Sequence, residues 1–491
     1  MPTLAFFTHK DLPMPNTCKH YIDGQWVDSQ GGRTIAVMNP ATDASATDMI
    51  LGTAADVDAA VIAARRAFET FSLTSKEERI ALLERIMAEY QKRIPDMARA
   101  IATEMGCPIS IAQTAQAGSG LGHLAQSLAA LKDYEFSEKI GDNRVVREAI
   151  GVVALITPWN WPMNQIVAKV GPALAAGCTM ILKPSEEAPS CAAIFAEIMH
   201  AAAVPAGVFN LVQGDGDGVG TALARHPDID MVSFTGSTRA GIMVAKNAAD
   251  TVKRVAQELG GKSPNIILQG TPLDIALPGG VGGVLLNSGQ SCVAPTRMLV
   301  HRSQHDEAAQ KVGAMFAAKK VGDPQSEGDH IGPVVSQRQW DRIQSLIQTG
   351  IDEGATLVTG GLGRPDGMDH GSYVRPTVFA NVTPDMTIAR EEIFGPVLVL
   401  MPYDDDEAAI RIANDTPYGL GAYVAGDPAH ARKFVSRLRA GAVFVNAGGL
   451  AFDMPFGGYK QSGNGREFGR FGLEEFLEVK SVIGALPEGV D

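Results

Sequence analysis

Short apolar runs alternate with helix-like stretches through the middle of this chain, and this alternation restricts its fold more than any other feature. The apolar runs lie at 151–156, 180–183, 208–212 and 232–234, and the helical stretches at 165–176, 190–203 and 238–249. Near-continuous apolar runs are typical of parallel strands buried on both faces, and parallel strands need crossover connections that are usually helices. The pattern predicts βαβ units and an open parallel sheet, with ligands bound at the carboxyl ends of its strands.

The same alternation resumes after residue 260, with strand-like runs at 265–268 and 297–300 and helical stretches at 279–288 and 306–319. A second α/β domain is therefore expected to begin near residue 260, which agrees with a length of 491 residues at about 100–200 residues per domain. Before the first sheet, 19–27 predicts a strand or hairpin, and 56–71 and 76–94 predict helices, the second with a capping box at Ser75 and Glu78.

Charge and hydropathy exclude several classes of protein. The chain has 42 Lys and Arg against 55 Asp and Glu, a net charge of −13, and no basic block that could follow a phosphate backbone, so a nucleic-acid partner is not expected. Met1–Lys10 shows no signal-peptide pattern. The apolar runs fall well short of the roughly 18 residues that span a bilayer, so no membrane partner is expected.

Five cysteines with no CxxC pair make a disulfide scaffold or a zinc site improbable, and no metal is expected. This cysteine usage favours a reducing, cytoplasmic location.

Two segments contain candidate catalytic residues. Cys292 ends the small-residue run Asn287-Ser288-Gly289-Gln290-Ser291-Cys292, and Glu258 begins Glu258-Leu259-Gly260-Gly261-Lys262. A thiolate is a strong covalent catalyst, and a carboxylate can activate the water that resolves the adduct. A lone cysteine is more often a small buried residue, however, and the Cys292 thiol would need backbone N–H groups or a cationic ring to lower its pKa.

Polar residues follow three of the predicted strands. The Asn160 amide, in Pro158-Trp159-Asn160, could donate to an oxyanion, and Lys183 and Glu186 suit a ribose, where a carboxylate favours NAD over NADP. Gly236, at a helix start, suits a pyrophosphate, although its GxxxxG spacing is not the usual dinucleotide motif. Taken alone, the Asn160 segment is better explained as a buried structural turn and the Lys183–Glu186 segment as a solvated helix start.

Together these segments resemble the aldehyde dehydrogenase superfamily, in the family's order and over nearly the whole chain. The matching segments are Pro158-Trp159-Asn160, Lys183-Pro184-Ser185-Glu186, Phe234-Thr235-Gly236-Ser237, Glu258-Leu259-Gly260-Gly261-Lys262, Gly289-Gln290-Ser291-Cys292, Glu392-Ile393-Phe394-Gly395-Pro396 and Pro455-Phe456-Gly457-Gly458. The resemblance implies NAD-dependent oxidation of an aldehyde to the carboxylic acid, with NADP possible.

The resemblance implies a role for each matched residue. Cys292 would be the nucleophile, Asn160 and the Cys292 backbone N–H the oxyanion hole, Glu258 the base for hydrolysis, and Glu467 a proton-relay residue. The implied cofactor contacts are Ile156, Thr157, Trp159, Lys183, Ser185, Glu186, Gly216, Phe234, Gly236, Ser237, Leu259, Glu392 and Phe394. Gly216 is included although the residues around it, Gly214–Gly218, indicate a turn with acidic residues that would repel phosphate.

The substrate pocket is implied at Trp161, Asn164, Gln165, Ala168, Ser291, Val293 and Phe456. Aromatic walls and two amides favour a medium-sized or aromatic aldehyde with a polar end, if Asn164 and Gln165 face the pocket rather than neighbouring helices. The chain has Trp161 where the family often has Phe, and Ala149 where it often has Pro. The loop after Asn446 looks shortened, so its pocket residues cannot be matched.

The implied architecture has three parts. An NAD-binding domain of Rossmann type would comprise 1–128 and 150–258, an α/β catalytic domain 259–455, and a small β oligomerisation element 129–149 and 470–491. Strands at 143–148 and 476–483 would extend a sheet across the interface of a homodimer or homotetramer.

Four alternatives stay open: preference for NADP, transfer of the acyl group to CoA, a catalytically silent family member, and a cofactor-free thiol hydrolase. Glu258 disfavours CoA transfer, because acylating members generally lack this glutamate. Intact Cys292, Glu258 and Asn160 disfavour a silent protein. The absence of a histidine from the Cys292 motif disfavours the hydrolase.

Overall fold

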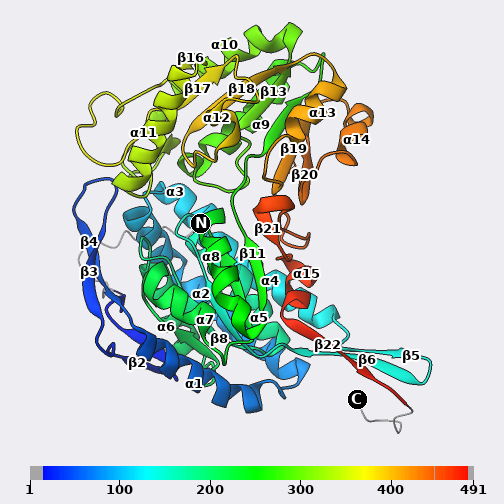
Figure 1. Cartoon of the computed structure of the whole chain (residues 1–491). Coiled ribbons are helices and arrows are strands. Elements are labelled where there is room, and N and C mark those ends of the chain that lie inside the picture. The colour runs from blue at the N-terminus through cyan, green and yellow to red at the C-terminus, as the bar shows by residue number, and fades with distance from the viewer. Residues whose placement is uncertain (1–14, 447, 485–491) are drawn as a thin grey trace, which may run out of the picture.

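The computed structural model of the chain describes residues 15–446 and 448–484. Met1–Lys10, where the sequence shows no signal-peptide pattern, and the end of the predicted oligomerisation element, 485–491, lie outside the described residues. The described chain forms two α/β units, one built mainly from the first half of the sequence and one mainly from the second, and a thin sheet that projects from the first (Figure 1).

The first unit is built on an eight-stranded sheet in the order β2-β1-β9-β8-β7-β10-β11-β21. Its central strands β9, β8, β7, β10 and β11 are parallel, and β1, β2 and β21 are antiparallel to their neighbours. The bounds are β1 (His20–Ile22), β2 (Gln25–Val27), β7 (Val152–Ile156), β8 (Thr179–Lys183), β9 (Phe209–Leu211), β10 (Met231–Thr235), β11 (Arg254–Glu258) and β21 (Gly463–Asn464). The predicted parallel α/β sheet is confirmed.

Helices cover both faces of this sheet because side chains alternate along its strands. Val153 and Leu155 of β7 pack into one core cluster, and Val152, Ala154 and Ile156 pack into another on the opposite face. The first cluster includes α2 (Lys76–Glu104), α4 (Gly118–Asp133), α5 (Pro162–Ala176) and α6 (Ser190–Ala201), and the second includes α1 (Ala54–Phe71), α7 (Thr221–Arg225) and α8 (Thr238–Ala248). A short helix α3 (Ile109–Ile111) and a π-helical turn, Ala112–Ala117, join α2 to α4.

Helix α2 is ten residues longer than the sequence predicts. The predicted end at residue 94 was wrong, because the helix continues through Pro95 to Glu104. A proline inside a helix costs about 3 kcal/mol, but Met97 and Ile101 are fully buried, and burying side chains of this size stabilises by about 1.5–3 kcal/mol each. Tertiary packing therefore outweighs the local breaker.

The second unit contains a seven-stranded sheet in the order β16-β17-β18-β13-β12-β19-β20, parallel except for β16. Its strands are β12 (Pro264–Ile267), β13 (Arg297–His301), β16 (Thr356–Thr359), β17 (Thr377–Ala380), β18 (Val397–Tyr403), β19 (Gly421–Ala425) and β20 (Ala442–Val445). Its helices are α9 (Leu273–Leu285), α10 (Arg302–Ala318), α11 (Gln337–Asp352), α12 (Thr387–Arg390), α13 (Asp406–Asn414) and α14 (Pro428–Val435). The helix predicted at 279–288 begins six residues earlier and ends three residues earlier, before the turn that leads to Cys292.

A three-stranded sheet, β22-β6-β5, extends away from the first unit (Figure 1). It pairs β6 (Asn143–Ala149) with β5 (Ser137–Ile140) and with β22 (Leu477–Val482), which follows α15 (Gly469–Glu475). Two small pairs complete the described strands. β3 (Arg33–Met38) is antiparallel to β4 (Ser45–Leu51), and β14 (Lys320–Val321) is parallel to β15 (His330–Ile331). Within 15–446 and 448–484, no helix is both long and apolar enough to cross a membrane.

Candidate active site

The carboxyl ends of the central strands bring the predicted site residues to one edge of the first sheet. In the strand register, Ile156 lies opposite both Lys183 and Phe234, and Thr235 lies opposite Glu258. The Gly236 backbone N–H then donates to the Glu258 carbonyl at 3.0 Å. Residues from four different strands therefore meet at this edge because the strands are parallel and in register.

A strained turn presents Cys292. Asn287, Ser288 and Gly289 all have a left-handed backbone, with φ of 55°, 56° and 76°. For the two residues with side chains this conformation costs on the order of 1 kcal/mol each. A side chain at Gly289 would have its Cβ 2.0 Å from the Gly395 carbonyl oxygen, so the turn needs glycine there.

Buried hydrogen bonds hold this turn in place. The Asn287 amide donates to the Asn160 carbonyl at 2.8 Å and accepts from Gln116 Nε2 at 3.0 Å, and the Ser288 hydroxyl donates to the Gly332 carbonyl at 2.8 Å. Gln290 Oε1 accepts from the Val335 N–H at 2.9 Å. Each such bond contributes a net 0.5–1.5 kcal/mol or so, about enough in sum to offset the backbone strain.

The Cys292 thiol is not activated by the protein alone. Burial raises its pKa, and the carboxylates of Glu392 and Glu258 raise it further, while the backbone N–H groups of Cys292 and Val293 lower it. The residue nevertheless keeps part of its surface open, unlike Cys107, Cys178 and Cys191. The thiol is therefore protonated at neutral pH and accessible to a ligand.

Asn160 lies where an oxyanion donor is needed. Its side chain is 5% exposed and lines the same cavity as Cys292. Its Nδ2 donates one hydrogen to the Gln290 carbonyl at 3.0 Å, which fixes the amide and leaves the second hydrogen for another acceptor.

Glu258 lies in a cluster of buried charges. Burial first, and then the neighbouring Glu467, raise the pKa of Glu258 well above its usual range, whereas Lys169 and Arg466 lower it. The Oε2 atom of Glu258 has no hydrogen-bond partner among the described residues. Lys169 of α5 forms a short ion pair with Glu467. This arrangement can hold a proton on Glu258 and pass it to a neighbouring carboxylate.

A cavity of about 170 Å³ opens beside Cys292. It is lined by Trp159, Asn160, Gln165, Gly236, Ser237, Leu259, Glu392 and Phe394, among others. The rings of Trp159 and Phe394 meet edge to face at 5.5 Å. Glu392 Oε1 accepts from the Gly261 N–H at 2.8 Å, and burial raises the pKa of the Glu392 carboxyl to about 7. Six of the residues predicted to contact the cofactor line this cavity, namely Trp159, Gly236, Ser237, Leu259, Glu392 and Phe394.

Of the other predicted cofactor residues, Ile156, Lys183 and Phe234 lie at the carboxyl ends of their strands, and Thr157, Ser185 and Glu186 follow those strands directly. Gly216 lies five residues after the end of β9. Lys183 Nζ lies 3.3 Å from Glu186 Oε2, and that carboxylate is about one-third exposed and open to a ligand. Ser185 Oγ accepts from the Glu187 N–H at 3.3 Å, and the Thr157 N–H donates to the Lys183 carbonyl at 3.0 Å. Gly216 begins a π-helical turn capped by Asp215, and nothing lies within 4 Å of its Cβ position.

These residues fit a dinucleotide. The partly exposed Glu186 carboxylate, paired with Lys183, suits the adenosine ribose, and the amino-terminal end of α8, capped by Ser237, suits a pyrophosphate. Glu392 beside the Trp159–Phe394 pair suits the nicotinamide ribose. Among the described residues, no group of three or more His, Cys, Asp or Glu side chains could hold a metal ion.

The opposite side of Cys292 is apolar and aromatic. Ala168, Leu420, Phe456 and Phe468 form a buried cluster against which Cys292, Val293 and Phe452 pack. We call this set the aromatic wall. Trp161 Nε1 donates to Ser291 Oγ at 2.8 Å, and Asn164 and Gln165 are 9% and 6% exposed. The predicted pocket residues thus gather around Cys292, but Asn164 turns toward α4.

Several residues of the site were missed from the sequence: Gln116, His123, Lys169, Asn287, Gln339, Arg342 and Phe468. Lys169 had a signal, because a lysine within the apolar stretch of α5 is rarely buried without a partner. Gln339 and Arg342, in contrast, come from α11 of the second unit, where they donate to the carbonyls of Phe394 and Glu392. Nothing local predicts that approach.

Comparison with known proteins agrees with this geometry. The family model described as the aldehyde dehydrogenase family matches residues 26–482. The 3-succinoylsemialdehyde-pyridine dehydrogenase of a Pseudomonas species is 54% identical over 94% of this chain and 98% of its own length.

Two solved structures are similar over almost the whole chain. An aldehyde dehydrogenase of Bartonella henselae is 50% identical with a TM-score of 0.94, covering 96% of this chain and 99% of its own. Aldehyde dehydrogenase C of Pseudomonas syringae, a cysteine-to-alanine variant in complex with NAD+ and octanal, is 50% identical with a TM-score of 0.95, covering 97% and 99%.

The family match, the sequence identities and the shared fold confirm the resemblance to aldehyde dehydrogenases that the sequence shows. This chain belongs to the aldehyde dehydrogenase family, whose general reaction is the NAD-dependent oxidation of aldehydes.

Proposed function

We propose that this enzyme oxidises a medium-sized or aromatic aldehyde to the free carboxylic acid through covalent intermediates on Cys292. The observation that carries the proposal is that Cys292, Asn160 and Glu392 line one cavity, with Glu258 close enough to influence the Cys292 thiol. A nucleophile, an oxyanion donor and a base are therefore in one place.

The first half of the reaction forms a thioester. Deprotonated Cys292 Sγ adds to the aldehyde carbon, and the resulting oxyanion accepts from Asn160 Nδ2 and the Cys292 backbone N–H. Loss of hydride from that carbon leaves the thioester. NAD, when bound, supplies the acceptor for the hydride and a positively charged ring near the thiol.

The second half releases the acid. Glu258 takes a proton from water, the water oxygen adds to the thioester carbon, and the C–S bond breaks to restore the Cys292 thiolate. Glu467 and Lys169 provide a buried route along which the proton leaves Glu258. Hydrolysis by this carboxylate favours a free acid over an acyl-CoA product.

Preference for NAD over NADP rests on Glu186. Its exposed carboxylate would accept from a ribose 2′-hydroxyl and repel a 2′-phosphate. A Glu186→Gln variant removes the charge, so its kcat/KM for NADP relative to NAD should rise about tenfold; an unchanged ratio would place the discrimination elsewhere.

The substrate proposal rests on the aromatic wall and on the relatives. One relative is named for a semialdehyde that carries a pyridine ring, and another was solved with octanal, so both long-chain and ring-bearing aldehydes are worth testing. The rings of Phe452, Phe456 and Phe468 suit either class.

The test is NADH formation by purified enzyme over aliphatic, aromatic and carboxylate-bearing aldehydes, with and without CoA. Cys292→Ala should lower the rate at least about 10⁴-fold while NAD still binds. Turnover that survives in Cys292→Ala, or turnover only with CoA, would contradict the proposed chemistry. NAD binding without turnover of any aldehyde would favour a silent protein.

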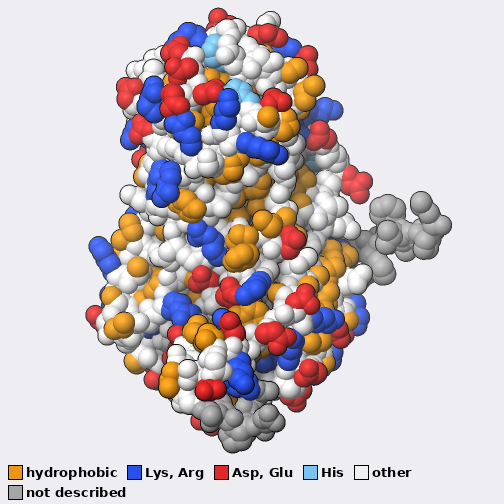
Figure 2. All heavy atoms as spheres, turned by 90° about the vertical axis from the view of Figure 1, so that its right-hand side faces the viewer, with side chains coloured by type: hydrophobic (Ala, Val, Ile, Leu, Met, Phe, Trp, Pro, Cys, Tyr) orange, Lys and Arg blue, Asp and Glu red, His pale blue; other side chains and the backbone are white. Residues whose placement is uncertain are grey.

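We also propose that the enzyme is a homo-oligomer with the domains predicted from the sequence, β5, β6 and β22 serving assembly, and that it acts in the cytoplasm. Strand β20 is an open edge of the seven-stranded sheet, and β22 and β5 are the open edges of the projecting sheet. Figure 2 shows hydrophobic side chains across the middle of the face that carries β20, β21 and α15. Leu450 and Met454, between β20 and β21, and Phe471 of α15 are exposed.

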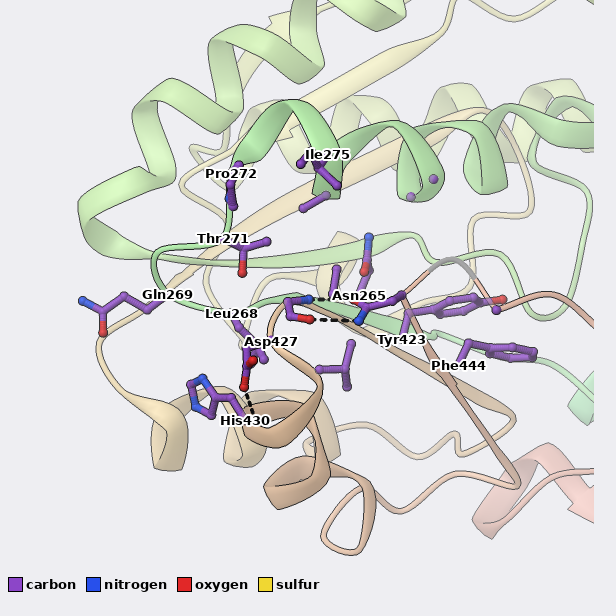
Figure 3. A pocket seen from close by; sticks show the side chains of 18 of the residues that line it. Asn265, Leu268, Gln269, Thr271, Pro272, Ile275, Tyr423, Asp427, His430 and Phe444 are labelled. Carbon is purple, nitrogen blue, oxygen red and sulfur yellow. Dashed lines mark hydrogen bonds between the residues drawn. The ribbon is translucent and has the colours of Figure 1, made fainter.

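A large groove near β20 supports this assignment. About 680 Å³ lies between α9 and strands β19 and β20 (Figure 3). Tyr423 and Phe444 stack along it with ring centroids 4.6 Å apart, and Ile275 of α9 is 78% exposed at its rim. An apolar helix side beside an open sheet edge suits a second copy of the chain.

Light scattering coupled to size-exclusion chromatography tests this assembly. Ile275→Glu or Val479→Glu should shift the enzyme toward monomer. Leu73→Glu is the matched control, because Leu73 is at least as exposed but lies just after α1. An unchanged mass for both test variants would contradict the assignment.

A further inference from the structure

One buried histidine beside the aromatic wall is not used by the proposed chemistry. His123 of α4 is 3% exposed, and its ring lies 4.3 Å from that of Phe452 and 4.6 Å from that of Phe468, centroid to centroid. Phe468 in turn stacks on Phe456 at 4.8 Å, within the cluster against which Cys292 packs. An otherwise aromatic surface near the nucleophile therefore contains one polar ring.

The hydrogen bonds fix which nitrogen of His123 carries the proton. Asn164 Nδ2 lies 3.0 Å from His123 Nε2, and Asn164 Oδ1 accepts from Gln165 Nε2 at 3.4 Å, which orients the Asn164 amide. An amide nitrogen only donates, so His123 Nε2 accepts and the hydrogen of the neutral ring is on Nδ1. Burial lowers the pKa of His123 to about 3, so the ring stays neutral at the pH of the cell.

This leaves one donor without a partner. No described residue accepts a hydrogen bond from His123 Nδ1. That nitrogen is also not fully enclosed by the protein. Gln165, which is linked to His123 through the Asn164 amide, has a second buried atom without a partner, the acceptor Oε1, and Gln165 lines the cavity next to Cys292. Unfilled hydrogen-bonding groups at a ligand site are costly unless the ligand fills them.

We propose that His123, positioned by Asn164, determines substrate specificity by donating its Nδ1 hydrogen to an uncharged acceptor on the distal part of the aldehyde. A ketone oxygen or a ring nitrogen meets this requirement. A carboxylate meets it less well, because a neutral donor does not compensate a buried charge and Lys169, one helical turn beyond Gln165 in α5, is already paired with Glu467. The preferred substrates are then aldehydes with a remote carbonyl or heteroaromatic nitrogen. This inference rests on the proposed function.

The test compares matched substrates. Heptanal is measured against 4-oxo-, 5-oxo- and 6-oxoheptanal, which place a ketone at three distances from the aldehyde at the same chain length. The wild-type enzyme should have a kcat/KM for one oxoheptanal about tenfold above that for heptanal, the size expected of one buried neutral hydrogen bond. The ratio should stay constant from pH 6 to 9, since His123 does not titrate there.

Three variants complete the test. His123→Phe keeps an aromatic ring but removes the donor, and Asn164→Leu removes the group that fixes the tautomer, so both should bring the ratio close to one. His305→Phe is the control, because His305 is also 3% exposed but lies in α10 of the second unit. It should keep the wild-type ratio.

The outcomes separate the two proposals. A wild-type enzyme that oxidises heptanal and every oxoheptanal equally well, or a His123→Phe variant that keeps the wild-type ratio, would overturn the role of His123 while leaving the proposed function intact. Absence of turnover with all four aldehydes would contradict the proposed function itself.

Discussion

The two sides of Cys292 are built by different means. On the cofactor side, hydrogen bonds join side chains to the backbone: the Glu392 carboxylate accepts from the Gly261 N–H, and Gln339 donates to the Phe394 carbonyl. On the substrate side, side chains bind side chains: Trp161 binds Ser291, Asn164 binds His123, and aromatic rings stack. We call the cofactor side the backbone-built side and the substrate side the side-chain-built side. Changes on the backbone-built side are expected to move the nucleophile, whereas changes on the side-chain-built side are not.

After the loss of Cys292 itself, the largest expected effect concerns the base that serves the nucleophile. Glu258→Gln keeps the shape of the side chain but cannot take a proton from water, so kcat should fall about 10³-fold. Because thioester formation does not need this base, a first-turnover burst of NADH should remain in stopped-flow absorbance. A lost burst would mean that Glu258 acts before the thioester, on Cys292 itself.

A second substitution tests how rigid the backbone-built side is. In Gly261→Ala the new Cβ would lie 2.2 Å from the Cys292 carbonyl oxygen, so the nucleophile must move. Misplacement of about 1 Å costs on the order of 10²-fold in kcat/KM. Gly118→Ala is the control, since its Cβ would meet only ordinary contacts at 3.4 Å. Equal activity of the two variants would show that the backbone on the cofactor side can move without displacing the nucleophile.

The buried charges between the two sides predict opposite shifts of the pH profile. Glu258 acts as a base only when ionised, so kcat should rise with pH through its raised pKa. Lys169 lowers that pKa and Glu467 raises it. Lys169→Met should therefore move the rising limb of the kcat profile to higher pH, and Glu467→Gln should move it to lower pH.

Shifts of both variants in one direction would mean that the ion pair acts only by holding the structure. Thermal unfolding of each variant is the control, because loss of a buried partner also lowers stability.

The smallest effect is expected on the side-chain-built side. Trp161→Phe removes the 2.8 Å bond to Ser291 Oγ but keeps an aromatic ring. The free energy of unfolding should fall by about 1 kcal/mol, and kcat should stay within about threefold of wild type. Denaturant unfolding and steady-state kinetics measure both quantities. A drop in kcat as large as that of Gly261→Ala would remove the distinction between the two sides.

Much of the fold could be predicted because its signals are local. Apolar runs and helical spacing along the chain predict β7, β8, β10 and the helices between them, and a parallel α/β sheet follows. Helix α2 could not be predicted beyond Pro95, since the burial of Met97 and Ile101 depends on α4 and α6, which come later in the chain.

The same division holds for the site. Motifs in the family's order located Cys292, Glu258, Asn160 and Glu392, and the structure brings them together. The left-handed turn at Asn287 and Ser288 carried no sequence signal, because neither residue requires such a backbone by itself. The sequence could not decide whether Asn164 faces the substrate pocket or a neighbouring helix. Its contact with His123 depends on how α4 packs against α5.

The sequence by itself determined the family, the type of fold and the residues able to carry the chemistry, because each depends on residue types at short, ordered spacings. Only the tertiary structure decided the environment of those residues. It buried Glu258 beside Glu467, paired Lys169 with Glu467, and put His123 among aromatic rings near Cys292. The physical reason is that pKa shifts and unfilled hydrogen bonds arise from contacts between segments far apart in the chain, and such contacts leave no pattern within any one segment.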